Sequence, residues 1–167
     1  VKAIVTDGTL SDTAIVKISL DDTPEPPKFD DHTPTFTVDE NVPAGTSVGF
    51  VVATDVDDDD TQNYSIGDPT DTFVIDSVTG EITVKADSTI DYEKKNEYTV
   101  TVVVIDKYGY TDTATVTINV NDLNETPDIP DQTLTFNEND PVGTTKVVVA
   151  TDPDTAKAFS TLTYELV

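Results

Sequence analysis

Apolar and polar residues alternate along Thr111–Val120. Successive side chains of an extended strand point to opposite faces, so every second residue shares a face. The apolar face of this segment holds Ala114, Val116, Ile118 and Val120. The polar face holds Thr113, Thr115, Thr117 and Asn119. This alternation predicts a β-strand that turns one face toward a core.

Similar short runs recur through the middle of the chain, and no segment shows the spacing of an amphipathic helix. Thr79-Gly80 separates two of these runs and predicts a tight turn. The strands that we expect span residues 33–39, 47–53, 62–66, 72–76, 81–85, 97–105 and 111–120. Short strands joined by short connections are typical of two antiparallel sheets packed as a sandwich. The expected fold class is therefore all-β.

An internal repeat organises the chain. Three pairs of segments match at nearly the same offset: Ser11–Asp22 with Thr111–Asp122 at 100 positions, Phe36–Val48 with Leu134–Lys146 at 98, and Ala53–Asp57 with Ala150–Asp154 at 97. Independent matches at one offset indicate tandem copies of a single folding unit.

This period predicts three parts. They are the C-terminal part of one repeat at residues 1–22, a complete repeat at 27–122, and the N-terminal part of the next at 128–167. Pro-rich segments at Thr23–Pro27 and Asn124–Pro130 are expected to be stiff linkers. We call the contact of the complete repeat with the preceding one joint one, and its contact with the following one joint two.

Composition restricts the partners. The formal net charge is −24, with 33 acidic and 9 basic residues. Such a field repels nucleic acid and anionic membranes and concentrates cations. A carboxylate coat that only maintains solubility is the alternative, and Asp58, Asp59 and Asp60 are expected to form a solvated loop of that kind. Cysteine is absent, so disulfides and thiolate metal sites are excluded.

Strand direction sorts the acidic residues between the two ends of the complete repeat. Antiparallel strands end alternately at opposite poles, so residues that follow the first, fifth and seventh strands meet at one pole. Stacking a further repeat there is expected to gather Glu40, Asp91, Glu93, Asn124, Glu125, Asp152 and Asp154 at joint two. Clustered carboxylates repel one another unless a cation lies among them. Calcium suits such a site because it takes six to eight oxygen ligands.

Several motifs together resemble the cadherin repeat. They are DEN at Asp39–Asn41, ATDVD at Ala53–Asp57, FVIDSVTGEI at Phe73–Ile82, DYE at Asp91–Glu93, VVVID at Val102–Asp106 and NDLNETP at Asn121–Pro127. The resemblance implies tandem seven-stranded Greek-key β-sandwich repeats of the immunoglobulin-like, cadherin type. It also implies an extracellular or cell-surface location and Ca²⁺ between repeats.

Site residues follow from the resemblance. At joint two it implies ligation of the first two ions by Glu40, Asp91, Glu93, Glu125 and the carbonyl of Leu123. The third ion would be held by Asn124, the carbonyl of Thr126, Asp152 and Asp154. At joint one it implies Glu25, Asp55, Asp57 and Asp106, with the remaining ligands before residue 1.

The sequence departs from the family pattern at a few positions. Tyr92 stands where the family has arginine, between two acidic residues that would be the ligands. Glu125 and Thr126 stand where it has Asp and Asn, and both can still offer oxygen. Pro24 replaces an asparagine at joint one and removes one side-chain ligand. The chain has no Trp, so the strand exchange of vertebrate cadherins is not expected.

These features favour a non-enzymatic role. No Ser, His and Asp motif and no phosphate-binding glycine loop is present. We expect calcium to stiffen a tandem array used for cell adhesion or as a surface stalk, whose partners are neighbouring repeats and a cell-surface protein or glycan. One alternative is a polysaccharide-binding module with structural calcium, for which Tyr108 and Tyr110 are candidate contacts. Another is a filament subunit that joins identical chains head to tail.

Overall fold

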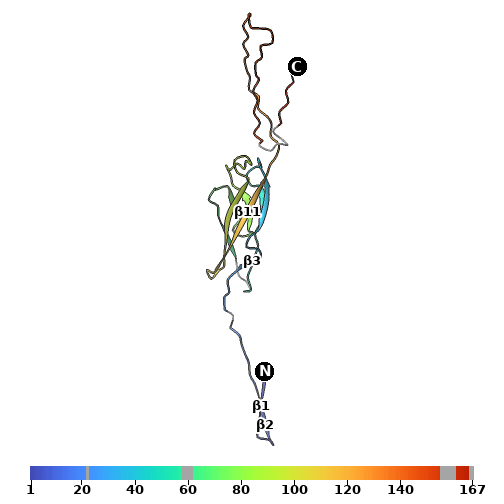
Figure 1. Ribbon diagram of the computed structural model, residues 1–167. Helices are drawn as coiled ribbons and strands as arrows, with labels where there is room; N and C mark the ends of the chain where they lie inside the picture. The colour runs from blue at the N-terminus through green and yellow to red at the C-terminus, as the bar shows by residue number, and fades with distance from the viewer. Residues whose placement is uncertain (22, 58–61, 155–160, 166–167) are drawn as a thin grey trace.

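The computed structural model describes residues 1–21, 23–57, 62–154 and 161–165. The predicted acidic loop at Asp58–Asp60 lies outside these residues. The chain is elongated, with a compact sandwich in the middle and an extended part at each end (Figure 1). Every regular element among the described residues is a β-strand. No helix long and apolar enough to cross a membrane occurs among them.

One layer of the sandwich is a four-stranded sheet. It contains β4 (Thr35–Asp39), β7 (Asn63–Gly67), β10 (Glu97–Ile105) and β11 (Thr111–Asn121) in the order β4-β11-β10-β7. The pairs of β10 with β7 and β11 are antiparallel, whereas β4 and β11 are parallel. Parallel pairing follows from strand parity, because the first and the seventh strand run toward the same pole.

The other layer is made of shorter strands. β5 (Ser47–Phe50), β8 (Phe73–Ile75) and β9 (Glu81–Val84) form a sheet in the order β5-β9-β8. β3 (Lys28–Phe29) pairs with β6 (Ala53–Thr54). The single strand expected at 47–53 is therefore divided into β5 and β6, and β3 was not expected. A two-residue strand is too short to show alternation.

The core lies between these layers and matches the alternation in the sequence. Ala114, Val116, Ile118 and Val120 of β11 are all buried. On β10 the alternation persists to the end of the strand, with Val102 and Val104 fully buried and Ile105 40% exposed. The all-β sandwich expected from the sequence is confirmed.

The Thr79-Gly80 turn joins the ends of β8 and β9. Asp76 Oδ1 accepts hydrogen bonds from the amides of Val78 and Thr79, at 2.9 and 2.8 Å. Gly80 has φ +71°, and a Cβ there would lie 2.3 Å from the carbonyl oxygen of Val51. Only glycine fits this position, because other residues resist this backbone region and would meet the neighbouring main chain.

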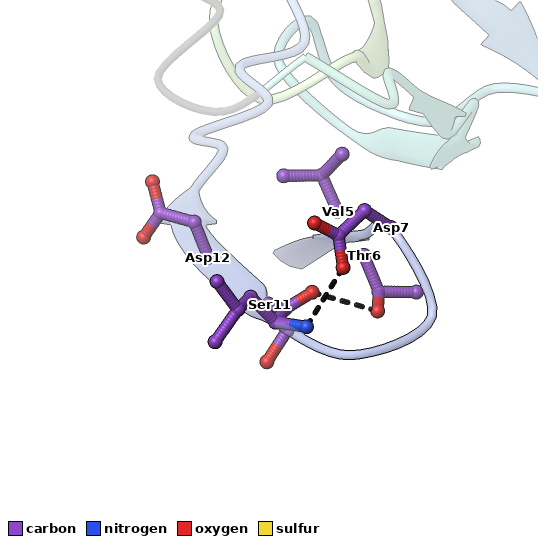
Figure 2. Close-up of a pocket in the computed structure, with 6 residues that line it drawn as sticks. Val5, Thr6, Asp7, Ser11 and Asp12 are labelled. Carbon is purple, nitrogen blue, oxygen red and sulfur yellow. Dashed lines mark hydrogen bonds between the residues drawn. The ribbon is translucent and has the colours of Figure 1, made fainter.

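At the N-terminal end, β1 (Lys2–Thr6) and β2 (Ser11–Ile15) form a hairpin. Figure 2 shows Asp7 at the turn of this hairpin. Its Oδ1 accepts hydrogen bonds from the Leu10 and Thr9 amides, and these bonds lower the pKa of Asp7 to about 2. The open hollow beside this turn has an exposed apolar side chain, Leu10, in its wall. At the other end, Asp128 bridges to Thr151.

Candidate metal centre

Glu40 is the buried centre of the pole at joint two. It follows β4 directly and is only 1% exposed. Its Oε2 accepts a hydrogen bond from the Tyr92 amide at 2.9 Å, and its Oε1 accepts one from the Leu123 amide at 2.7 Å. One carboxylate therefore ties the end of β4 to the 91–93 loop and to the linker that follows β11.

Two groups of three carboxylates lie at this pole, and Glu40 belongs to one of them. In the first, Glu40, Asp91 and Glu93 place one oxygen each within 4.8 Å of one another. In the second, Glu93, Asp122 and Asp154 do the same. Glu93 belongs to both groups, and Asp154 comes from beyond the linker. Acidic side chains from both sides of joint two therefore meet at one place.

Buried oxygens at this place lack donors. Asp122 Oδ1 and Asp154 Oδ1 are buried and accept no hydrogen bond from any residue that the structure describes. Burial, followed by the carboxylates of Asp154 and Glu40, raises the pKa of Asp122. A buried carboxylate oxygen without a donor is strongly destabilising unless a cation compensates it. The residues present therefore fit a bound cation.

The linker adds a main-chain contact across joint two. The Glu125 amide donates to Asp154 Oδ2 at 3.0 Å, and the Asp154 amide donates to Asp152 Oδ1 at 3.0 Å. The same pattern recurs at joint one, where the Glu25 amide donates to Asp57 Oδ2 and the Asp57 amide donates to Asp55 Oδ1, both at 2.9 Å. The two linkers thus make the same pair of amide-to-carboxylate hydrogen bonds.

Joint one also holds buried carboxylate oxygens. Asp106 is 5% exposed, and its Oδ1 accepts hydrogen bonds from the amides of Tyr108 and Tyr110, both at 2.8 Å. Asp106 Oδ2 and Asp55 Oδ2 accept none from the described part of the chain. The groups of three carboxylates found among the described residues all lie at joint two. Asp22, which the repeat period aligns with Asp122, lies outside the described residues.

The remaining expected ligands lie in or near the linker. Glu125 Oε1 accepts a hydrogen bond from Asn41 Nδ2 at 2.7 Å, and Asn124 Nδ2 donates to the Glu125 carbonyl at 3.2 Å. Leu123 is held through its amide by Glu40, and Thr126 is exposed. Neither Glu125 nor Asp152 belongs to the two carboxylate groups.

Sequence reasoning assigned no ligand role to Asp122, although strand parity placed it at this pole. The sequence did hold a hint: the equivalent position of the preceding repeat, Asp22, is also an aspartate. Lys94 was also missed. Its Nζ lies 2.6 Å from Asp91 Oδ2, and this hydrogen bond lowers the pKa of Asp91 and raises that of Lys94.

We predict that Lys94→Gln strengthens calcium binding at joint two. Lys94 is 79% exposed in its side chain, and an exposed ion pair contributes about 0.2–1 kcal/mol. Removing this competitor for Asp91 should raise calcium affinity by up to about fivefold, measured by titration calorimetry. Lys95→Gln is the matched control, since Lys95 lies over the Tyr98 ring instead of beside Asp91. Equal effects of both variants would show that net charge alone matters.

Comparisons with known proteins agree with this architecture. The family model "Cadherin domain" matches residues 34–121. The protocadherin-like wing polarity protein stan of Drosophila melanogaster is 38% identical over 136 residues, covering 77% of this chain. Human cadherin-12 is 31% identical over 168 residues, covering 95% of this chain. The chain spans 4% of the fly protein and 21% of the human one.

Solved structures of similar sequence show the same fold. The structure of mouse cadherin-23 EC22-24 has a TM-score of 0.65 at 29% identity, and the match covers 93% of this chain and 53% of that one. Human protocadherin-24 EC1-2 has a TM-score of 0.63 at 28% identity, with 81% of this chain and 63% of that one covered. The chain therefore belongs to the cadherin family, whose extracellular, non-enzymatic repeats bind calcium between neighbours.

Proposed function

We propose that calcium ions at joint two hold the complete repeat and the following one in a fixed arrangement, so that the array behaves as a rod. The observation that carries this proposal is the pair of carboxylate groups joined through Glu93, with Asp154 contributed from across the linker. An ion held there has ligands on both sides of the joint. Bending the joint would then require ligands to be pulled away from the ion.

The proposed ligands fall into three sets. Glu40, Asp91 and Glu93 hold an ion at the complete repeat. Glu93, Asp122 and Asp154 share an ion across the joint, with the Leu123 carbonyl and Glu125 completing these two sets. Asn124, the Thr126 carbonyl, Asp152 and Asp154 hold a third. Carboxylates, an amide and main-chain carbonyls are the oxygen donors that calcium takes.

At joint one we propose Glu25, Asp55, Asp57 and Asp106 as ligands. The repeated main-chain bonds to Asp57 and Asp55, and the buried oxygens of Asp55 and Asp106, support this assignment. Pro24 has no side-chain oxygen where the family has asparagine. We therefore expect the third ion of joint one to bind more weakly than that of joint two.

The mechanism is electrostatic. Carboxylates whose oxygens lie within 4.8 Å repel by roughly 3 kcal/mol per pair at an effective dielectric constant near 20. A divalent cation converts this repulsion into attraction and supplies the partner that the buried oxygens lack. Because the ion binds only the assembled joint, it also stabilises that state, by about 2.7 kcal/mol at 100 times the dissociation constant.

Small-angle X-ray scattering of the whole chain with calcium or a chelator tests the proposal. With calcium we expect a single extended shape. With chelator we expect a broader distribution of shapes and a shorter mean end-to-end distance, because the joints bend. Magnesium at equal concentration is the control, since it demands six ligands in rigid geometry and keeps its water. Scattering that is indifferent to calcium would refute the rod.

We further propose that the array serves cell adhesion or forms a surface stalk, with neighbouring repeats as its immediate partners. The polysaccharide-binding alternative requires aromatic side chains aligned on a sheet face. Tyr108 and Tyr110 are exposed, but they lie in the turn between β10 and β11. Because they lie in a turn and not on a sheet face, they give the polysaccharide-binding alternative little support.

A further inference from the structure

Two tripeptides of the chain match the acceptor motif for N-linked oligosaccharide. They are Asn63-Tyr64-Ser65 and Asn124-Glu125-Thr126. In secreted proteins the asparagine of Asn-X-Ser/Thr, with X not proline, is the modified residue. Cadherin repeats are extracellular, and the proposal rests on secretion of this chain through a compartment that adds such oligosaccharides. We propose that Asn63 carries an N-linked oligosaccharide and that Asn124 does not.

The alternation of side chains along β7 places that of Asn63 on the solvent-facing side of the sheet. Asn63 is the first residue of β7, and Tyr64 beside it is 8% exposed. The Tyr64 hydroxyl accepts a hydrogen bond from the Ala53 amide at 3.0 Å, which fixes this side chain on the inner side. Asn63 and Ser65 therefore share the outer face of the sheet, and both are exposed. The acceptor and its hydroxyl partner are thus displayed without any loss of core packing.

The position of β7 leaves room for a sugar. β7 is the edge strand of its sheet, paired on one side with β10. Asn63 lies opposite Ile105, which is 40% exposed on the same face, whereas the next residue, Asp106, is 5% exposed at joint one. An oligosaccharide on Asn63 would therefore project from the outer face of the sheet, on the side opposite the buried Asp106. It would also shield an open sheet edge from pairing with other chains.

The modification needs one co-reactant, an oligosaccharide activated as a lipid diphosphate. The Asn63 side-chain nitrogen attacks the anomeric carbon of the first sugar. A carbon–nitrogen bond forms, the bond from that carbon to the diphosphate oxygen breaks, and the lipid diphosphate leaves. The nitrogen loses one proton to a base of the transferring enzyme, and no electrons are exchanged.

The surroundings of Asn124 are different. Its Nδ2 donates to the Glu125 carbonyl at 3.2 Å, and the Glu125 amide bonds to Asp154 across joint two. Pro127 follows Thr126 and restricts the backbone of that residue. Asn124 is exposed, but a sugar there would lie directly beside the bond that the Glu125 amide makes across joint two. These contacts direct modification to Asn63.

The test is secretion of the whole chain from an animal cell line, followed by intact mass measurement before and after treatment with peptide N-glycosidase. Enzymatic release in heavy-oxygen water labels the modified position as aspartate, so peptide mapping locates it in the unaltered chain. We expect one oligosaccharide, at Asn63. Asn63→Gln and Ser65→Ala should each abolish the mass increment, whereas Ser65→Thr and Asn124→Gln should retain it.

Peptide mapping of the unaltered chain decides the outcome even if a variant is poorly secreted. An Asn63 peptide without label, in secreted and folded protein, overturns the proposal. An increment that survives Ser65→Ala but disappears in Asn124→Gln overturns it as well. Neither result depends on calcium, so the rod mechanism is tested separately.

Discussion

Replacing Glu40 with alanine should lower the free energy of unfolding of the complete repeat and eliminate tight calcium binding at joint two. The amides of Tyr92 and Leu123 would each lose their acceptor. A buried donor left without an acceptor costs about 1–3 kcal/mol. Both bonds are only partly buried, and loss of the Glu40 charge also relieves repulsion from Asp91 and Glu93, so the expected net loss in chelator is about 2 kcal/mol. A loss of about 2 kcal/mol shifts the unfolding midpoint of a domain of this size by roughly 8–16 °C.

Thermal unfolding in chelator, monitored by circular dichroism, measures the structural part of this effect, and calorimetry measures the calcium part. Glu40→Gln separates the two. Its amide oxygen can serve one of the two donors, so the variant should be less destabilised than alanine, yet it lacks the charge that calcium requires. Unchanged calcium affinity in Glu40→Gln would contradict the role of Glu40 as a ligand.

Asp154→Asn should have opposite effects in the presence and absence of calcium. The asparagine oxygen can still accept the hydrogen bond from Glu125, and its amide nitrogen can donate to the Asp122 oxygen that has no donor among the described residues. The joint without calcium should therefore be as stable as before or more so. With a charged ligand lost, calcium affinity should fall by at least tenfold, or about 1.4 kcal/mol.

Calcium titration and unfolding in chelator, applied to the same protein, test this reversal. Asp128→Asn is the matched control, because Asp128 lies in the same linker and bridges to Thr151 through its main chain. The control should leave calcium affinity within a factor of about two, as expected for a change of one exposed charge. Equal losses in both variants would argue against a specific role for Asp154.

Alternation was sufficient to predict the strands that supply the core. The β10 and β11 pair was predicted almost to the residue, because one face of each strand is apolar over most of its length. The division of residues 47–53 into β5 and β6 was not predicted. It arises where the chain passes from one pairing partner to another, and this choice depends on contacts distant in sequence.

The candidate site was predictable where strand direction alone determined position. Parity placed Glu40, Asp91 and Glu93 at one pole, and the structure brings them together. The role of Asp122 depends on the direction of its side chain, and the Lys94 contact depends on the turn within the 91–95 segment. Neither can be read from the spacing of acidic residues, because both are set by local backbone geometry.

Glu93 belongs to both of the carboxylate groups proposed to hold an ion, and this sharing has a thermodynamic consequence. Once the first ion has oriented Glu93, the second meets a ligand that is already ordered, so occupancy should rise cooperatively with calcium concentration. Stiffness would then change over a narrow concentration range instead of gradually. Under the proposed function, each joint would thus pass from flexible to stiff over a modest change in calcium concentration.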